Sequence, residues 1–435
     1  MNNTSNSSLD PWVTILPSKR IDIPIDFIWG VASSAFQAEG GEVNNDWVQL
    51  AKEGRVPQNP GNGFWELAGD DMRLIAGLGF DHYRLSVEWS RVEPEPGRFD
   101  NKAIDRYKAI CDAAQNMGIT PWVNLFHFTH PLWFIEKGGF LDEANHADFL
   151  RYVERMGSAL ASHADHFHVA NESMVYVLSC YRAGRFPPFI RDLELAYDMT
   201  RNVLALHAEG YRILKSVDPV PTVAAIEVYL DPRPEDPENP KHREIAERFD
   251  AWYHGTMLEA LATGWIRLPG RDPEEIFHLK GAIDLYGFNY YSSVSYGTDT
   301  INSYSDHRDP PIDAMGRKVF PKGMEEGLIR ISKALPDIPL LVTENGCPTI
   351  DENFRIRYVA SHLAAIDRAR EKGAQVNGYF HWTAVDNYEW LEGFSDARFG
   401  LISFDPETRE RQVKTSGDWF KKLIATGYLD PESIP

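Results

Sequence analysis

The stretch HFHVANES, from His166 to Ser173, shows the unit that recurs along this chain. Its apolar residues are typical of a β-strand, and the strand ends in polar residues just before an amphipathic segment. One of those polar residues is Glu172, a carboxylate that is costly to bury unless it has a partner or a task. The stretch therefore predicts a buried strand that delivers a chemically active group at its end.

Eight apolar runs of this kind are predicted to be strands. They cover residues 27–33, 81–87, 120–128, 166–171, 221–228, 282–291, 338–344 and 376–382. Patterns with apolar residues at three- and four-residue steps predict helices between them. These patterns cover residues 64–79, 101–118, 147–160, 194–216, 243–263, 322–335, 352–372 and 416–426. Gly79, Gly118 and Gly373 stand where three of the helices should end.

Alternation of strand and helix favours the α/β class with a parallel sheet, and eight such units favour a single closed (β/α)8 TIM barrel. A doubly wound open sheet is the alternative. The segment GVASSAFQAEGG (30–41), however, fits neither a dinucleotide fingerprint nor a phosphate loop. We expect a flexible polar tail over residues 1–20 and one catalytic domain over residues 21–435. Two long polar segments, 229–244 and 295–316, are expected to be loops at the barrel rim.

Composition restricts the class of partner. The formal net charge of −20 argues against nucleic acid or an anionic membrane as the main partner. The N-terminal residues lack the basic and apolar regions of a secretory signal, and no apolar run approaches the ~20 residues of a membrane span. Cys111, Cys180 and Cys347 are too few for a disulfide framework and are expected to be buried free thiols. We therefore expect a cytoplasmic enzyme, with its oligomeric state open.

In such a barrel the active site lies at the carboxyl ends of the strands. The side chains predicted there are mostly polar or aromatic. They include Gln37, Glu39, Arg84, Trp89, Arg91, His127, Asn171, Glu172, Asn289, Tyr290, Tyr291, Glu344, Asn345, Trp382, Asp386, Glu389 and Trp390. Carboxylates on opposite strands are what hydrolysis of a glycosidic bond requires. One carboxyl group gives a proton to the leaving oxygen, and the other attacks the anomeric carbon as a carboxylate. A neighbouring arginine and tyrosine would keep one group ionised, while a negative neighbour would raise the pKa of the other.

Seven motifs, in order, resemble those of glycoside hydrolase family 1, the family of retaining β-glucosidases and β-galactosidases. They are FIWGVASSAFQAEG (27–40), YRLSVEWSRVEPEPG (83–97), LFHFTHP (125–131), ANES (170–173), GFNYY (287–291), VTENG (342–346) and GYFHWTAVDNYEWLEGF (378–394). The resemblance extends from about Phe27 to Trp419, which is nearly the whole chain.

The resemblance implies a catalytic role for five residues. Glu344 would be the nucleophile, and Glu172 would be the general acid and then the general base. Arg84 and Tyr291 would contact the nucleophile and keep it ionised, and Asn289 would lie beside the catalytic pair. Between Tyr290 and Tyr291, which alternation places on opposite faces of the strand, the family pattern selects Tyr291.

The resemblance also implies how the sugar is bound. Asn171 would bind the 2-hydroxyl, and Gln37, His127 and Glu389 would bind other hydroxyls. Trp382 would form a platform under the ring, and Trp390 would hold its far edge. Ser173 stands where the family usually has proline, so the turn after Glu172 is less fixed by covalent structure.

These inferences lead us to expect a retaining exo-β-glycosidase that acts on a small β-glycoside or a short oligosaccharide. A β-D-glucoside is the favoured substrate, with galactosides and fucosides tolerated and 6-phosphoglycosides repelled by Glu389. No cofactor is expected. His127 and His130 have the H-x-x-H spacing of some metal ligands, but we favour no metal because the first strand lacks His-x-His. A sugar-binding protein on an inactive barrel and a transglycosylase remain as alternatives.

Overall fold

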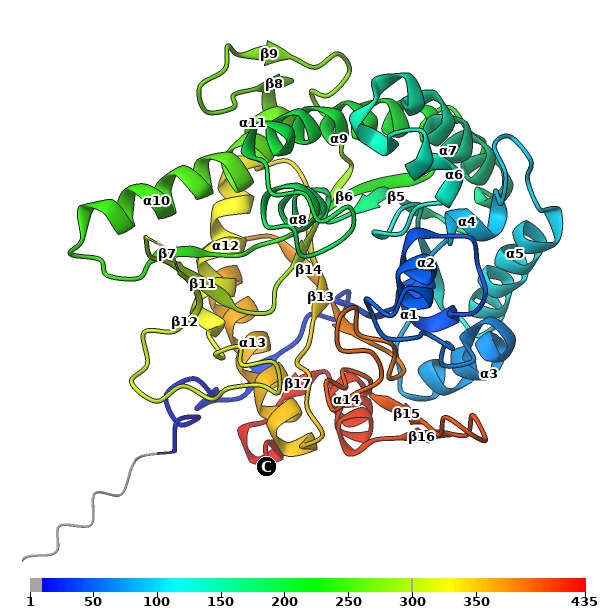
Figure 1. Cartoon of the computed structure of the whole chain (residues 1–435). Coiled ribbons are helices and arrows are strands. Elements are labelled where there is room, and N and C mark those ends of the chain that lie inside the picture. The colour runs from blue at the N-terminus through cyan, green and yellow to red at the C-terminus, as the bar shows by residue number, and fades with distance from the viewer. Residues whose placement is uncertain (1–9, 299) are drawn as a thin grey trace, which may run out of the picture.

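The structure is a computed structural model that describes residues 10–298 and 300–435. Eight parallel strands close into a barrel, and helices surround it (Figure 1). The barrel strands are β2 (Ile28–Ala32), β3 (His82–Ser86), β4 (Thr120–Asn124), β5 (His166–Asn171), β6 (Thr222–Val228), β10 (Leu285–Asn289), β13 (Leu340–Asn345) and β14 (Val376–Trp382). Each falls within or nearly within one of the eight predicted runs. The barrel closes where β14 pairs with β2, so the TIM-barrel prediction is confirmed and the open sheet is excluded.

The helices of the outer layer follow the predicted segments closely. They are α3 (Phe64–Gly77), α5 (Asn101–Asn116), α7 (His146–Leu160), α9 (Leu193–Leu214), α10 (Pro240–Asp250), α11 (Thr256–Thr263), α12 (Pro321–Ala334), α13 (Glu352–Glu371) and α14 (Thr415–Thr426). The helix predicted over 243–263 is divided by the π-helical turn η4 (Ala251–Gly255). Gly79, Gly118 and Gly373 have φ values of 94°, 75° and 96° just after helix ends, as predicted.

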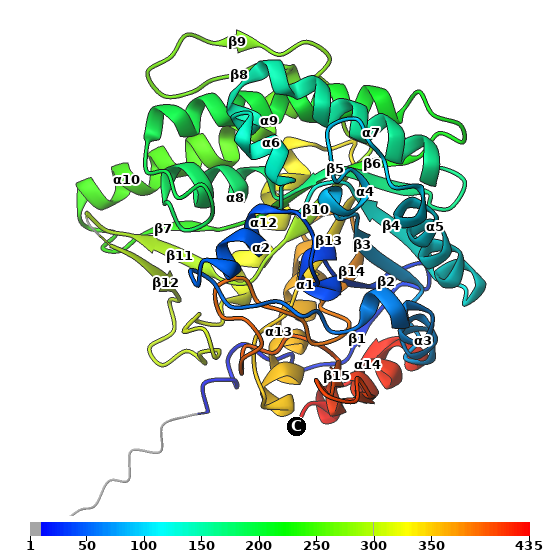
Figure 2. The same ribbon diagram turned by 45° about the vertical axis from the view of Figure 1, so that its right-hand side comes forward.

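Shorter elements connect and cover the barrel. The short helices are α1 (Ala35–Glu39), α2 (Asp46–Lys52), α4 (Trp89–Val92), α6 (Leu132–Glu136), η1 (Gly139–Leu141), η2 (Glu143–Asn145), α8 (Ser173–Val177), η3 (Leu178–Arg182) and η5 (Pro431–Ser433). The short strands pair as β1 (Ile21–Asp22) with β17 (Tyr428–Leu429), β8 (Trp265–Ile266) with β9 (Glu274–Glu275), and β15 (Ile402–Phe404) with β16 (Arg411–Val413). Figure 2 shows α1 and α2 in front of the barrel strands.

Alternation along each strand separates two cores. A small cluster fills the barrel interior and comprises Trp122, Ala224, Ile226, Leu285, Leu341 and Phe380. On β6, Ala224 and Ile226 belong to this interior, whereas Val223 and Ala225 belong to the large core between strands and helices. The alternation places the next residue, Glu227, on the outer face of β6. On this face Glu227 can contact the residues that follow Glu172.

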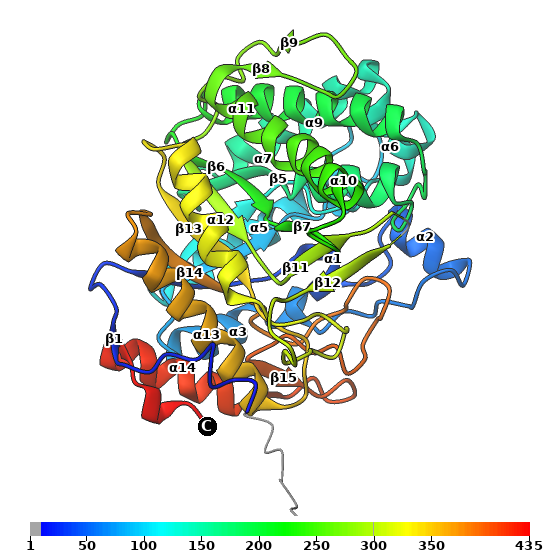
Figure 3. The ribbon, with the colours of Figure 1, turned by 90° about the vertical axis from the view of Figure 1, so that its left-hand side faces the viewer.

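Parts of the two long polar segments pair into a small sheet at the rim, whereas residues 305–316 form a loop as predicted. β7 (Pro232–Pro234) lies in the first segment, 229–244. β11 (Ser293–Tyr296) overlaps the start of the second segment, 295–316, and β12 (Ile301–Tyr304) lies within it. The strand order is β12-β11-β7, and Figure 3 shows the three strands side by side. Backbone pairing therefore gives these polar segments an order that their composition did not predict.

The start of the chain differs from the predicted flexible tail. Residues 1–9 of that tail lie outside the described residues. Trp12 and Ile15 are buried, and the Trp12 ring packs edge-on against Phe354 at 5.1 Å. Burial of one large aromatic side chain stabilises its segment enough to hold it on the barrel. None of the helices in the described part of the chain is both long and apolar enough to cross a membrane.

The three cysteines are free and buried, as predicted. Burial raises the pKa of Cys347, just after the nucleophile motif, to about 12. The thiol is therefore protonated and packs as a small apolar group.

Candidate active site

A cavity of about 530 Å³ lies at the carboxyl ends of the barrel strands. Most of the predicted site residues line it: Gln37, His127, Asn171, Glu172, Tyr291, Glu344, Trp382, Glu389 and Trp390. Arg84 and Asn289 are not part of this lining. They are buried behind the cavity and hydrogen-bond its two central carboxylates. The structure therefore brings together residues from six barrel strands and from α1.

Glu344, at the end of β13, is held from two sides. The Arg84 guanidinium on β3 donates to Oε1, and the Tyr291 hydroxyl donates to Oε2 at 2.5 Å. A second nitrogen of Arg84 donates to Asn171 Oδ1 at 2.7 Å, which fixes the guanidinium in turn. A buried cation and a hydroxyl donor both favour the charged form of a carboxylate. Glu344 is therefore held in one orientation by a buried cation and a hydroxyl donor.

Glu172, at the end of β5, has a different environment. Its Oε1 accepts a hydrogen bond of 2.7 Å from Asn289 Nδ2. The Asn289 amide is oriented because Thr343 Oγ1 donates to its oxygen at 2.7 Å. Burial raises the pKa of Glu172 well above its usual value, and the negative charge of Glu344 raises it further. Glu172 therefore holds a proton under conditions in which an exposed carboxylate would have lost it.

The two tyrosines at the end of the sixth barrel strand separate as predicted. Tyr291 faces the cavity and contacts Glu344. Tyr290 points away and donates to the Phe320 carbonyl at 2.7 Å. Burial, followed by the charge of Glu344, raises the pKa of Tyr291 well above its usual value. Tyr291 therefore remains a donor to the carboxylate at neutral pH.

His127 is held as a neutral hydrogen-bonding side chain. Burial and the nearby Arg84 lower its pKa well below the usual value. Its Nδ1 lies 3.1 Å from Asn124 Nδ2 and 3.1 Å from Ser86 Oγ. Its Nε2 lies 3.4 Å from Asn171 Nδ2, so an amide nitrogen faces each of the two ring nitrogens. A neutral imidazole offers one donor and one acceptor, and both suit a sugar hydroxyl.

Aromatic residues form one wall of the cavity. The Trp382 ring is nearly parallel to the His127 ring, with centroids 6.0 Å apart, and Trp390 is related to His127 in the same way at 6.2 Å. The loop that carries Glu344 approaches this wall closely. A Cβ atom on Gly346 would lie 2.0 Å from the Trp382 carbonyl oxygen, so only glycine fits there.

Glu389 and Gln37 lie on the loops around the cavity. Burial raises the pKa of Glu389 to about 7, an effect that the positive charge of Arg317 opposes. Gln37 is completely buried on α1 and donates to the Tyr388 carbonyl at 2.7 Å. That bond ties α1 to the loop on which Glu389 lies.

His130 has a different partner set from His127. Its ring contacts Asp46 Oδ2 at 2.8 Å and Tyr176 Oη at 3.0 Å. Within residues 10–298 and 300–435, no group of three His, Cys, Asp or Glu side chains is arranged to hold a metal ion. His130 thus has a structural explanation in a buried hydrogen-bond network.

Two charged residues beside the cavity have no counterpart in the sequence-based predictions. Arg317 lines the cavity, pairs with Asp313 at 2.8 Å and lies over the Tyr291 ring at 5.1 Å. Glu227 on β6 is buried and accepts hydrogen bonds from the residues that follow Glu172. No local pattern marks either residue, because each reaches the site through contacts between distant segments.

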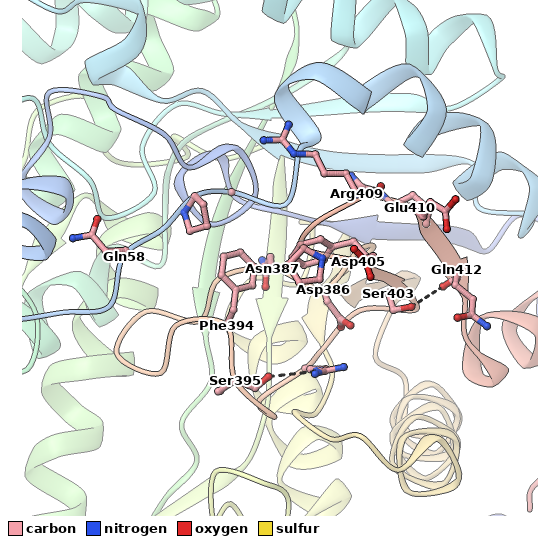
Figure 4. Close-up of a pocket in the computed structure, with 16 residues that line it drawn as sticks. Gln58, Asp386, Asn387, Phe394, Ser395, Ser403, Asp405, Arg409, Glu410 and Gln412 are labelled. Atoms are coloured by element: carbon pink, nitrogen blue, oxygen red, sulfur yellow. Dashed lines mark hydrogen bonds between the residues drawn. The ribbon is translucent and has the colours of Figure 1, made fainter.

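A larger cavity lies elsewhere. About 990 Å³ is enclosed between residues 58–61, the loop after β14 and the β15–β16 hairpin (Figure 4). Asp386, on the loop after β14, accepts hydrogen bonds from Gly400 N and Lys414 Nζ at 2.8 Å each. None of the residues predicted to act in catalysis or to bind the sugar lines this larger cavity.

A TIM barrel with two buried carboxylates in one cavity, one beside an arginine and one raised in pKa, defines a glycoside hydrolase. Comparison with known proteins gives the family. The sequence profile of Glycosyl hydrolase family 1 matches residues 19–428, so the chain belongs to that family.

Relatives and solved structures agree with this assignment. Beta-glucosidase A of Thermotoga maritima is 28% identical over 94% of this chain and 98% of its own length. The 6-phospho-beta-galactosidase of Clostridium acetobutylicum is 27% identical over 92% of this chain and 96% of its own length. The structure of a beta-glycosidase from Pyrococcus horikoshii superposes with a TM-score of 0.86, at 33% identity over 95% of this chain and 97% of that one. The family-level prediction is therefore confirmed, whereas the sugar differs among relatives of similar identity.

Proposed function

We propose that the protein is a retaining exo-β-glycosidase that releases the terminal β-D-glucosyl residue of small glycosides or short oligosaccharides. One observation carries this proposal: Glu344 and Glu172 share a cavity but have opposite environments. Glu344 is bonded by Arg84 and Tyr291, whereas burial and the charge of Glu344 raise the pKa of Glu172. One carboxylate thus suits attack, and the other suits proton donation.

In the first step, a carboxylate oxygen of Glu344 forms a bond to the anomeric carbon. The bond from that carbon to the glycosidic oxygen breaks, and its electron pair leaves with the oxygen. The proton of Glu172 moves to the same oxygen, so the aglycone departs as a neutral alcohol. The products are a glycosyl ester of Glu344 and an ionised Glu172.

In the second step, the roles reverse. Glu172 takes a proton from a water molecule, whose oxygen forms a bond to the anomeric carbon. The ester bond to Glu344 breaks, and Glu344 regains its charge. Two inversions restore the starting configuration, and the required separation of the two carboxyl groups is roughly 5–5.5 Å.

The walls of the cavity support a neutral hexose as the sugar. Trp382 offers an apolar face, and Gln37, His127 and Asn171 offer donors and acceptors to hydroxyl groups. Glu389 is ionised above its pKa of about 7, so it accepts hydrogen bonds from hydroxyls and repels a phosphate. A 6-phosphogalactoside is the second candidate, because relatives with that specificity are as similar as the beta-glucosidases are.

A panel of nitrophenyl substrates tests both the proposed glycosidase activity and the proposed choice of sugar. We expect colour release from the β-glucoside, slower release from the β-galactoside and β-fucoside, and little from 6-phosphoglycosides. Proton NMR of the first-formed sugar should show the β-anomer. An α-anomer would contradict retention. A 6-phosphoglycoside cleaved much faster than its parent would replace the glucoside assignment, and no release from any substrate would favour the inactive barrel. Product analysis at high acceptor concentration separates hydrolysis from transglycosylation.

A further inference from the structure

Glu227 is a buried carboxylate that the proposed reaction does not use. It lies one residue from the end of β6 and is 3% exposed. Its carboxylate oxygens accept from the backbone N–H of Met174, and the Ser173 N–H and hydroxyl beside them lower its pKa; none of these groups carries a charge. Burial raises the pKa of Glu227 to about 8. A carboxyl group kept in such a place without a cation needs a structural or functional reason.

The donors to Glu227 belong to the first turn of α8, directly after Glu172. Met174 N lies 3.1 Å and 3.3 Å from its two oxygens, and the backbone N–H and the hydroxyl of Ser173 are close enough to lower the pKa of Glu227. The first N–H groups of a helix have no partner within the helix and usually receive one from the N-cap side chain. Here the N-cap is Glu172, whose side chain makes no capping bond and is held by Asn289 instead. Glu227 supplies the missing cap from the neighbouring strand.

The backbone of Glu172 needs this support. Its φ and ψ of 49° and 56° lie in the left-handed region, which is costly for a residue with a side chain. Glu172 N donates to the Ile226 carbonyl at 2.9 Å. Ile226 directly precedes Glu227, so the end of β6 holds the chain on both sides of the Glu172 Cα atom.

Ser173 explains how this chain manages without the proline usual in the family at that position. Proline would fix φ through its ring but would offer Glu227 neither an N–H nor a hydroxyl. Serine offers both. The direction of the backbone after Glu172 is thus set by hydrogen bonds to a buried carboxyl group in place of a covalent ring.

We propose that Glu227, acting through Ser173 and Met174, is a positioning residue that aims the Glu172 carboxyl group at the leaving oxygen. This inference rests on the proposed role of Glu172 as proton donor. The inference predicts a specific kinetic effect, because a misplaced general acid slows only those reactions in which the leaving group needs a proton.

The test compares aryl β-glucosides whose leaving groups differ in basicity, with kcat/KM as the readout of the first chemical step. For Glu227→Leu we expect kcat/KM for phenyl β-glucoside to fall about 10- to 100-fold, the scale of a misplaced general acid. For 2,4-dinitrophenyl β-glucoside, whose leaving group needs no proton, the change should be less than about threefold. Glu325→Leu, which removes a buried carboxylate of α12 away from the cavity, controls for general damage and should not steepen the leaving-group dependence.

Ser173→Pro provides a second variant, because proline is well tolerated at the first helical position. It should steepen the leaving-group dependence in the wild-type background and add little in the Glu227→Leu background, since both changes break the same contact. If Glu227→Leu does not fold, the leaving-group dependence of Ser173→Pro is sufficient to test the proposal. The positioning role would be overturned by an equal loss of kcat/KM for both substrates, or by an unchanged dependence of kcat/KM on the basicity of the leaving group. The proposed glycosidase activity is judged separately, by whether the wild-type protein cleaves either substrate.

Discussion

Two cavities border the loop that follows β14, and the smaller one contains the candidate catalytic residues. The larger cavity, of about 990 Å³, is lined by carboxylates with ordinary surroundings. Asp386 is paired with Lys414, and backbone N–H groups of Thr408 and Glu407 lower the pKa of the fully exposed Asp405. The smaller cavity, of about 530 Å³, contains Glu172 and Glu389, whose pKa values burial raises. Desolvated acidic groups that share one cavity mark a candidate active site better than volume does.

The largest difference between the two cavities should appear when the nucleophile is removed. We expect Glu344→Gly to lower kcat/KM for aryl β-glucosides by on the order of 10⁴- to 10⁶-fold, since the change removes the carboxylate on which the proposed ester forms. Added azide or formate should restore part of the activity by occupying the space of the missing carboxylate. Substantial activity without an added nucleophile would remove Glu344 from its assigned role.

Removal of the proton donor should have a smaller and more selective effect. Glu172→Ala should lower kcat/KM for phenyl β-glucoside by about 10² to 10⁴, the usual contribution of a general acid. The loss for 2,4-dinitrophenyl β-glucoside should be much smaller, and azide should yield a β-glucosyl azide. Equal losses on both substrates would show that Glu172 acts mainly in folding or binding.

The charge of Glu344 should control the pKa of Glu172. The raised pKa means that wild-type kcat/KM falls as pH rises through that pKa, because the acid form is needed. A 2-fluoroglucosyl group trapped on Glu344 removes the negative charge that raises the Glu172 pKa. We therefore expect a lower Glu172 pKa in the trapped enzyme, measured by NMR titration of labelled glutamate. An unchanged pKa would mean that burial alone sets it.

Arg317 should affect sugar binding through Glu389. Its positive charge lowers the Glu389 pKa, so Arg317→Gln raises that pKa above about 7 and protonates more of Glu389 at neutral pH. We expect KM for the β-glucoside to rise about 3- to 10-fold at pH 7, the effect of roughly 1 kcal/mol, and the rise to shrink at higher pH. Arg185→Gln, at an exposed arginine of the same cavity, is the matched control and should not show this pH dependence. A pH-independent rise would argue for a direct contact with substrate.

Changes in the larger cavity should have the smallest effect. Arg398→Gln and Gln412→Ala alter exposed side chains that line it, and kcat/KM should stay within about twofold of wild type. A fall beyond tenfold, with an unchanged melting temperature, would show that the cavity in Figure 4 takes part in substrate use.

Local patterns were sufficient to predict the barrel and most of the candidate site. Strand and helix periods are short-range properties, so the eight runs and the helices between them were visible in the sequence. Motifs at strand ends predicted the lining residues because parallel strands in a closed barrel must deliver their carboxyl ends to one face. Trp12 was missed because a single aromatic residue in a polar segment has no period to reveal its burial.

Only the tertiary structure decided which partners these residues have. Arg84 and Glu344 are 260 positions apart, and Glu227 and Met174 are 53 apart. Whether such groups meet depends on strand order and register, which fix side-chain directions to within one residue. The sequence by itself determined that Ser173 follows Glu172 without the ring of a proline. The packing of β6 against α8 determined that a buried carboxyl group lies beside Ser173 and accepts from Met174 N, because strand order and register place the end of β6 next to the residues that follow β5.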